Sequence, residues 1–322
     1  MLNNKNIKIL LKTVLGLSLF LWMAYSLYNQ IQSQENLKST IYSLFNEWSF
    51  EKVVLLITVI ILMFSNWMIE AVKWKLLLKD TEEFSLSTSF QSVLTGVAVS
   101  VITPNRIGEY MGRILYLKNV NKIKGITVTI IGSFAQLIVT GFLGLIGLVY
   151  YIFFVKQSSW LYILLATSVV LCIVLTYLYF HLYKIVDWID RYQFLRKLKI
   201  YIEVIKRFDK GILNKILFIS LLRYFVYTLQ FILLLRLMLV FISFPDMLFT
   251  IWLIFWAMAI VPTITIAELG VRGETALFFL SVFSSNQFGI VASSLLLWLI
   301  NLIIPALIGC LFVYKMKIYE DD

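Results

Sequence analysis

The sequence predicts an all-α polytopic membrane protein with about six spans and two re-entrant hairpins, arranged as two inverted halves. Of its 322 residues, 61% are hydrophobic and 14% are charged, and the mean hydropathy is +0.88. Apolar runs long enough for a spanning helix of roughly 20 residues recur along the chain, and the basic residues gather in alternate connecting segments. A membrane β-barrel would instead require shorter segments of alternating polarity. We therefore expect residues 1–322 to form a single membrane domain.

The apolar runs give the order of the elements. They cover approximately 9–28, 52–72, 86–103, 125–154, 161–182, 213–242, 248–262, 275–283 and 290–314. The first run follows several lysines, as in a signal peptide, but "AYS" at 24–26 is a poor cleavage site. We therefore expect the first run to remain as an uncleaved span.

The basic residues predict the orientation, because cytoplasmic loops are enriched in lysine and arginine. Most of them precede the first span, follow residue 314, or lie in 70–88, 113–124 and 183–212. The other connecting segments, 29–52, 155–160 and 243–248, together hold only Lys38, Lys52 and Lys156. We therefore expect a protein of a bacterial plasma (inner) membrane with both termini in the cytoplasm.

Two interrupted apolar segments predict re-entrant hairpins. Residues 86–112 lie between two basic segments and are too few for two spans of about 20 residues each, so this part of the chain should enter and return on the same side. The stretch "AIVPTITIAELGVRGETA" at 259–276 lies between connectors without lysine or arginine and predicts a second hairpin, entering from outside. Residues 246–283 could instead form two short spans, which would give eight spans in all.

With these assignments, residues 1–154 and 161–314 repeat one order of spans and hairpin in opposite orientations. Inverted halves with broken helices at corresponding positions are typical of transporters, whose site lies where the breaks meet. Between the halves, residues 184–209 have apolar residues at helical spacing and basic residues on other faces. This pattern predicts an amphipathic helix on the cytoplasmic leaflet or, alternatively, a solvated connector.

The first hairpin contains charged residues where a break is expected. Thr103 followed by Pro104 predicts a helix start, with a hydroxyl N-cap and then proline at the first helical position. Such a helix places Arg106, Glu109 and Arg113 on one face. Its positive dipole end and Arg106 would attract an anionic group such as phosphate. The alternative is an internal Arg–Glu–Arg ladder that fastens the hairpin to its neighbours.

The second hairpin has a similar set of residues. The stretch "TIAE" at 265–268 fits a capping box, so Glu268 either caps a helix or takes part in substrate or proton coupling, with Arg272 four residues later. Ionisable groups at membrane depth are costly, and the candidate substrate-binding residues are therefore Arg106, Glu109, Arg113, Glu268 and Arg272. The expected structural or hinge positions are Thr103, Pro104, Gly108, Pro262, Gly270 and Gly273, the last two allowing close approach of another backbone.

Four further charged residues lie within or at the ends of apolar runs. Glu70 and Lys73 are expected to snorkel to the interface, and Arg223 and Arg236 to contact a lipid headgroup or to snorkel. The sequence contains no P-loop, dinucleotide fingerprint, nucleophile elbow or metal-ligand spacing, so we expect no cofactor, no metal and no enzymatic activity. The net charge of +10 fits loops that face anionic lipid better than it fits nucleic-acid binding.

The stretches "EAVKW" at 70–74, "TPNRIGEYMGR" at 103–113 and "AELGVRGETA" at 267–276 resemble the flippase-like integral membrane family related to the transmembrane domain of lysylphosphatidylglycerol synthases. The resemblance implies a module that moves a phospholipid between leaflets. The family-like positions are Arg106, Gly108, Glu109, Arg113, Glu268, Gly270 and Arg272. In bifunctional members a soluble C-terminal domain attaches the amino acid. This sequence ends "KMKIYEDD", so we expect a stand-alone protein without the synthase domain.

These inferences together predict binding and flipping of an anionic lipid or lipid-linked intermediate between bilayer leaflets. One alternative is a lipid-binding scaffold for a separate envelope-lipid synthase, and another is a membrane-embedded transferase acting on lipid-linked substrates. The expected partners are membrane lipids with an anionic headgroup and an envelope-lipid biosynthetic enzyme.

Overall fold

The computed structural model describes residues 21–22, 25–34, 37–46, 49–101, 103, 107–117, 122–181, 208–260 and 265–320. Throughout this part of the chain the regular elements are helices, which confirms the predicted all-α polytopic class. Most of the predicted first span and nearly all of the predicted amphipathic helix at 184–209 lie outside the described residues.

Five helices of the described part are long and apolar enough to cross a membrane. They are α3 (Phe50–Leu78), α6 (Lys122–Phe154), α7 (Ser159–Phe180), α10 (Lys210–Leu237) and a last span built from α13 (Gln287–Trp298), a π-helical segment (Leu299–Ile303) and α14 (Ile304–Glu320). A short helix, α2 (Leu37–Asn46), precedes α3. With the predicted span at 9–28, this order agrees with six spans.

Side chains at the helix starts explain several of these boundaries. Ser49 Oγ accepts a hydrogen bond from the Lys52 amide and caps α3, and Asp209 Oδ1 accepts one from the Ile212 amide (2.7 Å) and caps α10. Such caps satisfy amides that have no partner in the first helical turn. The long apolar runs that follow each cap then continue as spans.

The first interrupted segment folds as an antiparallel pair, α4 (Leu86–Val101) and α5 (Gly108–Ile114). The helices approach so closely that a Cβ on Gly112 would lie 2.6 Å from Gly96 Cα. At 1.5 Å per residue, α5 is only about 10 Å long and cannot return across a bilayer of about 30 Å. The pair therefore has the dimensions of the predicted re-entrant hairpin.

The predicted helix start at Thr103 and Pro104 is corrected by the structure. Helix α5 begins at Gly108, and its N-cap position is Ile107. The Thr103 hydroxyl still accepts a hydrogen bond from the Gly108 amide (2.8 Å) while it donates one to Val99 O (3.1 Å). Thr103 thus joins the end of α4 to the start of α5, and Gly108 lacks the side chain that would collide with this turn.

The second interrupted segment forms α11 (Phe244–Ile260) and α12 (Thr265–Leu280). Each helix is about 25 Å long, slightly less than the apolar thickness of a bilayer. Re-entrance of this segment stays a prediction, and so does the alternative of two short spans.

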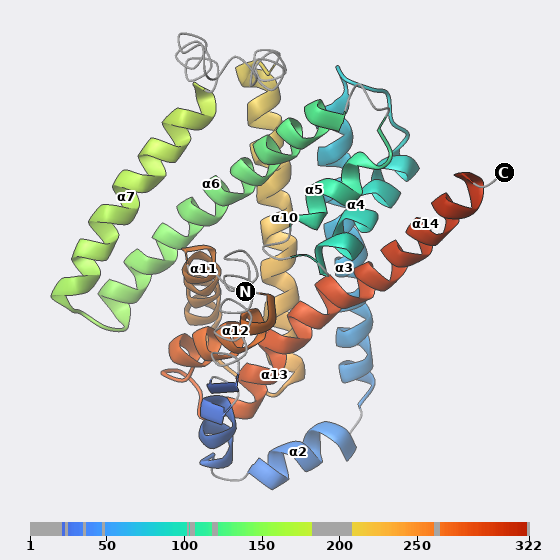
Figure 1. The fold of residues 1–322 in the computed structure, drawn as a ribbon. Coiled ribbons are helices and arrows are strands. Elements are labelled where there is room, and N and C mark those ends of the chain that lie inside the picture. The colour runs from blue at the N-terminus through green and yellow to red at the C-terminus, as the bar shows by residue number, and fades with distance from the viewer. Residues whose placement is uncertain are drawn as a thin grey trace, which may run out of the picture.

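The spans and hairpins pack in a reciprocal arrangement. Helices α3 and α10 run antiparallel through the centre, α6 packs along α11, and α14 packs along α4 (Figure 1). Glycines allow both of these last contacts: a Cβ on Gly147 would lie 2.9 Å from the Leu253 amide, and one on Gly309 would meet the backbone of Leu94. Each hairpin is therefore covered by the last span of the other half of the chain. Helix α7 lies at the edge of the bundle against α6.

Candidate functional site

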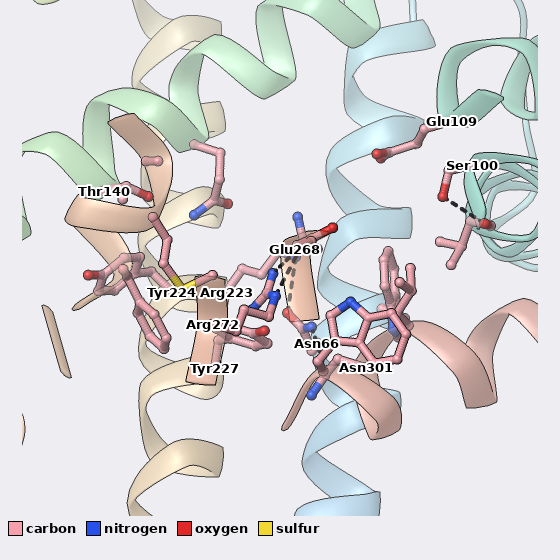
Figure 2. Close-up of a pocket in the computed structure, with 18 residues that line it drawn as sticks. Asn66, Ser100, Glu109, Thr140, Arg223, Tyr224, Tyr227, Glu268, Arg272 and Asn301 are labelled. Atoms are coloured by element: carbon pink, nitrogen blue, oxygen red, sulfur yellow. Dashed lines mark hydrogen bonds and ion pairs between the residues drawn. The ribbon is translucent and has the colours of Figure 1, made fainter. Parts of the chain in front are cut away.

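A cavity of about 310 Å³ lies where the two hairpins meet the central helices. Its polar lining includes Asn66 of α3, Glu109 of α5, Arg223 of α10, Glu268 and Arg272 of α12, and Asn301 of the π-helical segment (Figure 2). Aromatic side chains of α3, α10, α11 and α13 complete the wall. Its size and its mixture of apolar wall with a few polar groups are typical of a ligand site.

Glu70 lies behind the cavity wall and contacts three basic side chains. Its carboxylate lies 2.7 Å from Lys73 Nζ, 3.0 Å from Arg113 Nη1 and 2.8 Å from Arg223 Nη1. Only 5% of the Glu70 side chain and 2% of the Lys73 side chain are exposed. The expectation that Glu70 and Lys73 snorkel is therefore wrong. They lie on the face of α3 that also bears Asn66, and this face turns toward the bundle interior.

Arg113 is held entirely by the protein. It bonds to Glu109, four residues before it, and to Glu70 of α3, and its guanidinium lies over the Trp74 ring at 5.5 Å. Its side chain is 2% exposed and does not line the cavity. This geometry resembles the fastening ladder considered as the alternative, while the predicted contact of Arg113 with substrate stays a prediction.

Arg223 was expected near an interface, but it lies in the middle of α10. Its Nε donates to Asn66 Oδ1 (3.0 Å), its Nη1 donates to Glu70, and its guanidinium lies over the Trp67 ring at 5.1 Å. With 22% of its side chain exposed, it faces the cavity. The signal for this residue was present in the sequence, because an arginine in the centre of a long apolar helix is costly and usually functional.

Asn66 also connects α3 to the last span. Its Nδ2 donates to Asn301 Oδ1 (3.2 Å), and Asn301 Nδ2 donates in turn to Leu297 O. The π-helical geometry of residues 299–303 displaces the regular hydrogen-bond ladder there, a feature frequent at functional sites. Asn301 was not among the sequence candidates.

In the second hairpin, Glu268 and Arg272 both line the cavity. Arg272 donates through Nε (3.1 Å) and Nη2 (2.7 Å) to one oxygen of Glu268, and it lies beside Tyr227 of α10. Helix α12 begins at Thr265, the first position of the predicted capping box. The Thr265 side chain is not among those that the structure describes, so the capping box stays a prediction.

The predicted structural positions are described only in part. Gly270 is buried in α12, and a Cβ on Gly273 would lie 2.9 Å from Leu27 Cδ1, so Gly273 approaches a side chain rather than another backbone. The remaining candidates, Arg106, Pro104 and Pro262, lie outside the described residues, and their roles stay predictions.

Among the described residues, the charged groups of the site have a small excess of positive charge. Its basic groups are Lys73, Arg113, Arg223 and Arg272, and its acidic groups are Glu70, Glu109 and Glu268. Two of the arginines, Arg223 and Arg272, reach the cavity and can donate charge-assisted hydrogen bonds to a phosphate or carboxylate. Within the described residues, no group of three His, Cys, Asp or Glu side chains is placed to hold a metal ion.

Comparison with known proteins gives one match. A family model described as "Lysylphosphatidylglycerol synthase TM region" matches residues 9–309. No curated protein and no solved structure matches the chain.

Proposed function

The chain belongs to the lysylphosphatidylglycerol synthase TM region family, and from this premise we propose that it binds an anionic membrane lipid, or a lipid-linked intermediate, and flips it between bilayer leaflets. The family match confirms the resemblance drawn from the sequence and links this membrane protein to lipids. The proposal further places the protein in a bacterial plasma (inner) membrane, with both termini in the cytoplasm, and assigns it no enzymatic activity.

The observation that supports transport most directly is the depth of Arg223. It lies 13 residues from the start of α10 and 14 from its end, or about 20 Å from either. A protein that only held a headgroup at the surface would need its arginine near an interface. An arginine at mid-depth, open to a cavity that Arg272 shares, fits a headgroup that passes through the membrane centre.

The reciprocal packing supports the two inverted halves. Each hairpin ends in a helix with a glutamate and an arginine four residues apart, Glu109–Arg113 and Glu268–Arg272. Helix α6 of the first half covers α11, and α14 of the second half covers α4. Transporters built from inverted halves bind substrate between the repeats, and the binding site opens to each side of the membrane in turn.

Leaflet exchange in liposomes tests the proposal. Purified protein is reconstituted with fluorescent phosphatidylglycerol, and the fraction that an added reductant can bleach is followed over time. The wild type should make the inner-leaflet lipid accessible, and Arg223→Gln and Arg272→Gln should each slow exchange by at least tenfold, because a charge-assisted hydrogen bond contributes about 1.5–3 kcal/mol.

The matched control is Lys215→Gln, which removes a basic residue at an exposed position of the same helix α10. It should exchange lipid at the wild-type rate. Wild-type protein that binds the lipid without exchanging it would instead favour the scaffold for a separate envelope-lipid synthase. A new lipid product would favour the transferase.

A further inference from the structure

The three basic side chains that contact Glu70 differ in their access to the cavity. Lys73 and Arg113 are each 2% exposed and have no access to the cavity, whereas Arg223 is 22% exposed and lines it. Of the three, Arg223 therefore faces both the internal carboxylate and the space where a headgroup would bind.

Two hydrogen bonds hold the guanidinium of Arg223, and one of them is to the charged group Glu70. Nε donates to Asn66 and Nη1 to Glu70, while the second N–H of Nη1 and both N–H groups of Nη2 have no hydrogen-bond partner among the described residues. Arginine grips phosphate or carboxylate best with two parallel N–H groups. Nη1 has a second N–H, but while Glu70 accepts from this nitrogen its carboxylate offsets the positive charge that a grip through Nη1 and Nη2 would present to an anion, so the full grip forms when Glu70 releases Nη1.

Glu70 can release Arg223 without becoming an unpaired buried charge. One of its oxygens remains 3.0 Å from Arg113 Nη1, and the other remains 2.7 Å from Lys73 Nζ. Leaving a buried carboxylate with no partner would cost several kcal/mol. The two remaining cations avoid this cost, so the exchange of partners at Arg223 is feasible.

We infer that Glu70 competes with the substrate for Arg223. In the empty site the Glu70 carboxylate accepts a hydrogen bond from Arg223; this bond breaks when the anionic group of the headgroup binds to Arg223, and it forms again when the headgroup leaves. This inference rests on the proposed function and assigns Glu70 a positioning role in it. Transport requires binding that is strong enough to admit the headgroup and weak enough to release it, and competition by Glu70 lowers the affinity without removing the arginine.

The substitution Glu70→Gln separates this role from a structural one. Without the competing charge, the protein in neutral detergent should bind short-chain phosphatidylglycerol about tenfold more tightly by calorimetric titration. In liposomes the same variant should exchange lipid more slowly at saturating lipid, because release is impeded. A purely structural role predicts the opposite for affinity, since a disturbed site binds less tightly. Glu51→Gln, on the exposed first turn of α3, is the matched control and should change neither measurement.

A second variant controls for a folding defect in Glu70→Gln. Glu70→Gln alone leaves Lys73 without its carboxylate, whereas Glu70→Gln combined with Lys73→Met removes the buried pair together and keeps the net charge of the site. The double variant should also bind the lipid more tightly than the wild type. Monodisperse preparations of both variants that bind with wild-type or lower affinity would overturn the role of Glu70. That outcome would leave the proposed function standing if the wild type exchanges lipid and Arg223→Gln does not.

Discussion

Arg113 and Arg272 hold corresponding positions in the two hairpins, but only Arg272 reaches the cavity. Each follows a glutamate by four residues and is paired with it. Arg113 has a second carboxylate partner in Glu70 and is 2% exposed, whereas Arg272 is 13% exposed and lies beside Tyr227. The same pair of residue types thus contacts a further protein carboxylate in one hairpin and lines the cavity in the other.

This difference predicts separate effects on stability and transport. Arg113→Gln should lower the free energy of unfolding by about 3–5 kcal/mol, because it removes one member of a buried ion-pair network. Arg272→Gln should lower it much less while it impairs lipid exchange. Thermal unfolding in detergent, followed by circular dichroism for the two variants side by side, provides the comparison. Equal losses of stability would mean that Glu109–Arg113 and Glu268–Arg272 both serve mainly to stabilise the fold.

Lysine at position 272 should restore exchange only in part. It keeps the positive charge but loses the planar fork through which Arg272 donates from Nε and Nη2. In the liposome assay we expect the rate of Arg272→Lys to lie between those of the wild type and Arg272→Gln. A rate equal to that of the wild type would show that charge alone suffices.

The close contact within the first hairpin predicts a strong response to a single methyl group. A Cβ on Gly112 would lie 2.6 Å from Gly96 Cα, and backbone cannot move aside as a side-chain end can. Gly112→Ala should therefore destabilise the protein by about 1–3 kcal/mol and lower its melting temperature. Gly141→Ala is the control, because its Cβ would meet only Cys172 Sγ at an ordinary 3.8 Å. Equal melting temperatures for the two variants would contradict the observed α4–α5 contact.

The re-entrant first hairpin predicts which connectors share a side of the membrane. Single cysteines at Glu82 and Lys122, in a background without Cys172 and Cys310, should react with a membrane-impermeant maleimide only after the cells are permeabilised. Cysteines at Lys156 and Ser285 should react in intact cells. Reaction at Lys122 in intact cells would mean that α4 and α5 together cross the bilayer once, and the inverted-repeat proposal would lose its basis.

The order of spans and the location of the first hairpin were predictable, because both depend on local properties of the chain. A span is visible as an apolar run, and a break is visible where charges and proline interrupt one. The pairs Glu109–Arg113 and Glu268–Arg272 could also be predicted from the sequence, since residues four apart share a helix face.

The network of Glu70 could not be predicted in the same way. Glu70 and Arg223 are 153 residues apart, and they meet only because α3 and α10 cross with these faces together. Periodicity shows that a helix has a polar face, but it does not show what that face contacts. Glu70 and Lys73 looked like the end of a span, although α3 continues to Leu78 and places both inside the bundle.

The reciprocal covering of the hairpins also constrains how the chain matures. Helix α14, which covers α4, begins about 200 residues after α4 ends. At a synthesis rate of about 5–20 residues per second, α14 is synthesised roughly 10–40 s after the first hairpin. Its early partners, Glu70 for Arg113 and Ser92 for the Arg113 carbonyl, are synthesised before α5. The ion pair that ties α5 to α3 and the hydrogen bond that ties α5 to α4 can therefore both form while the ribosome is still adding the second half, before α14 is synthesised.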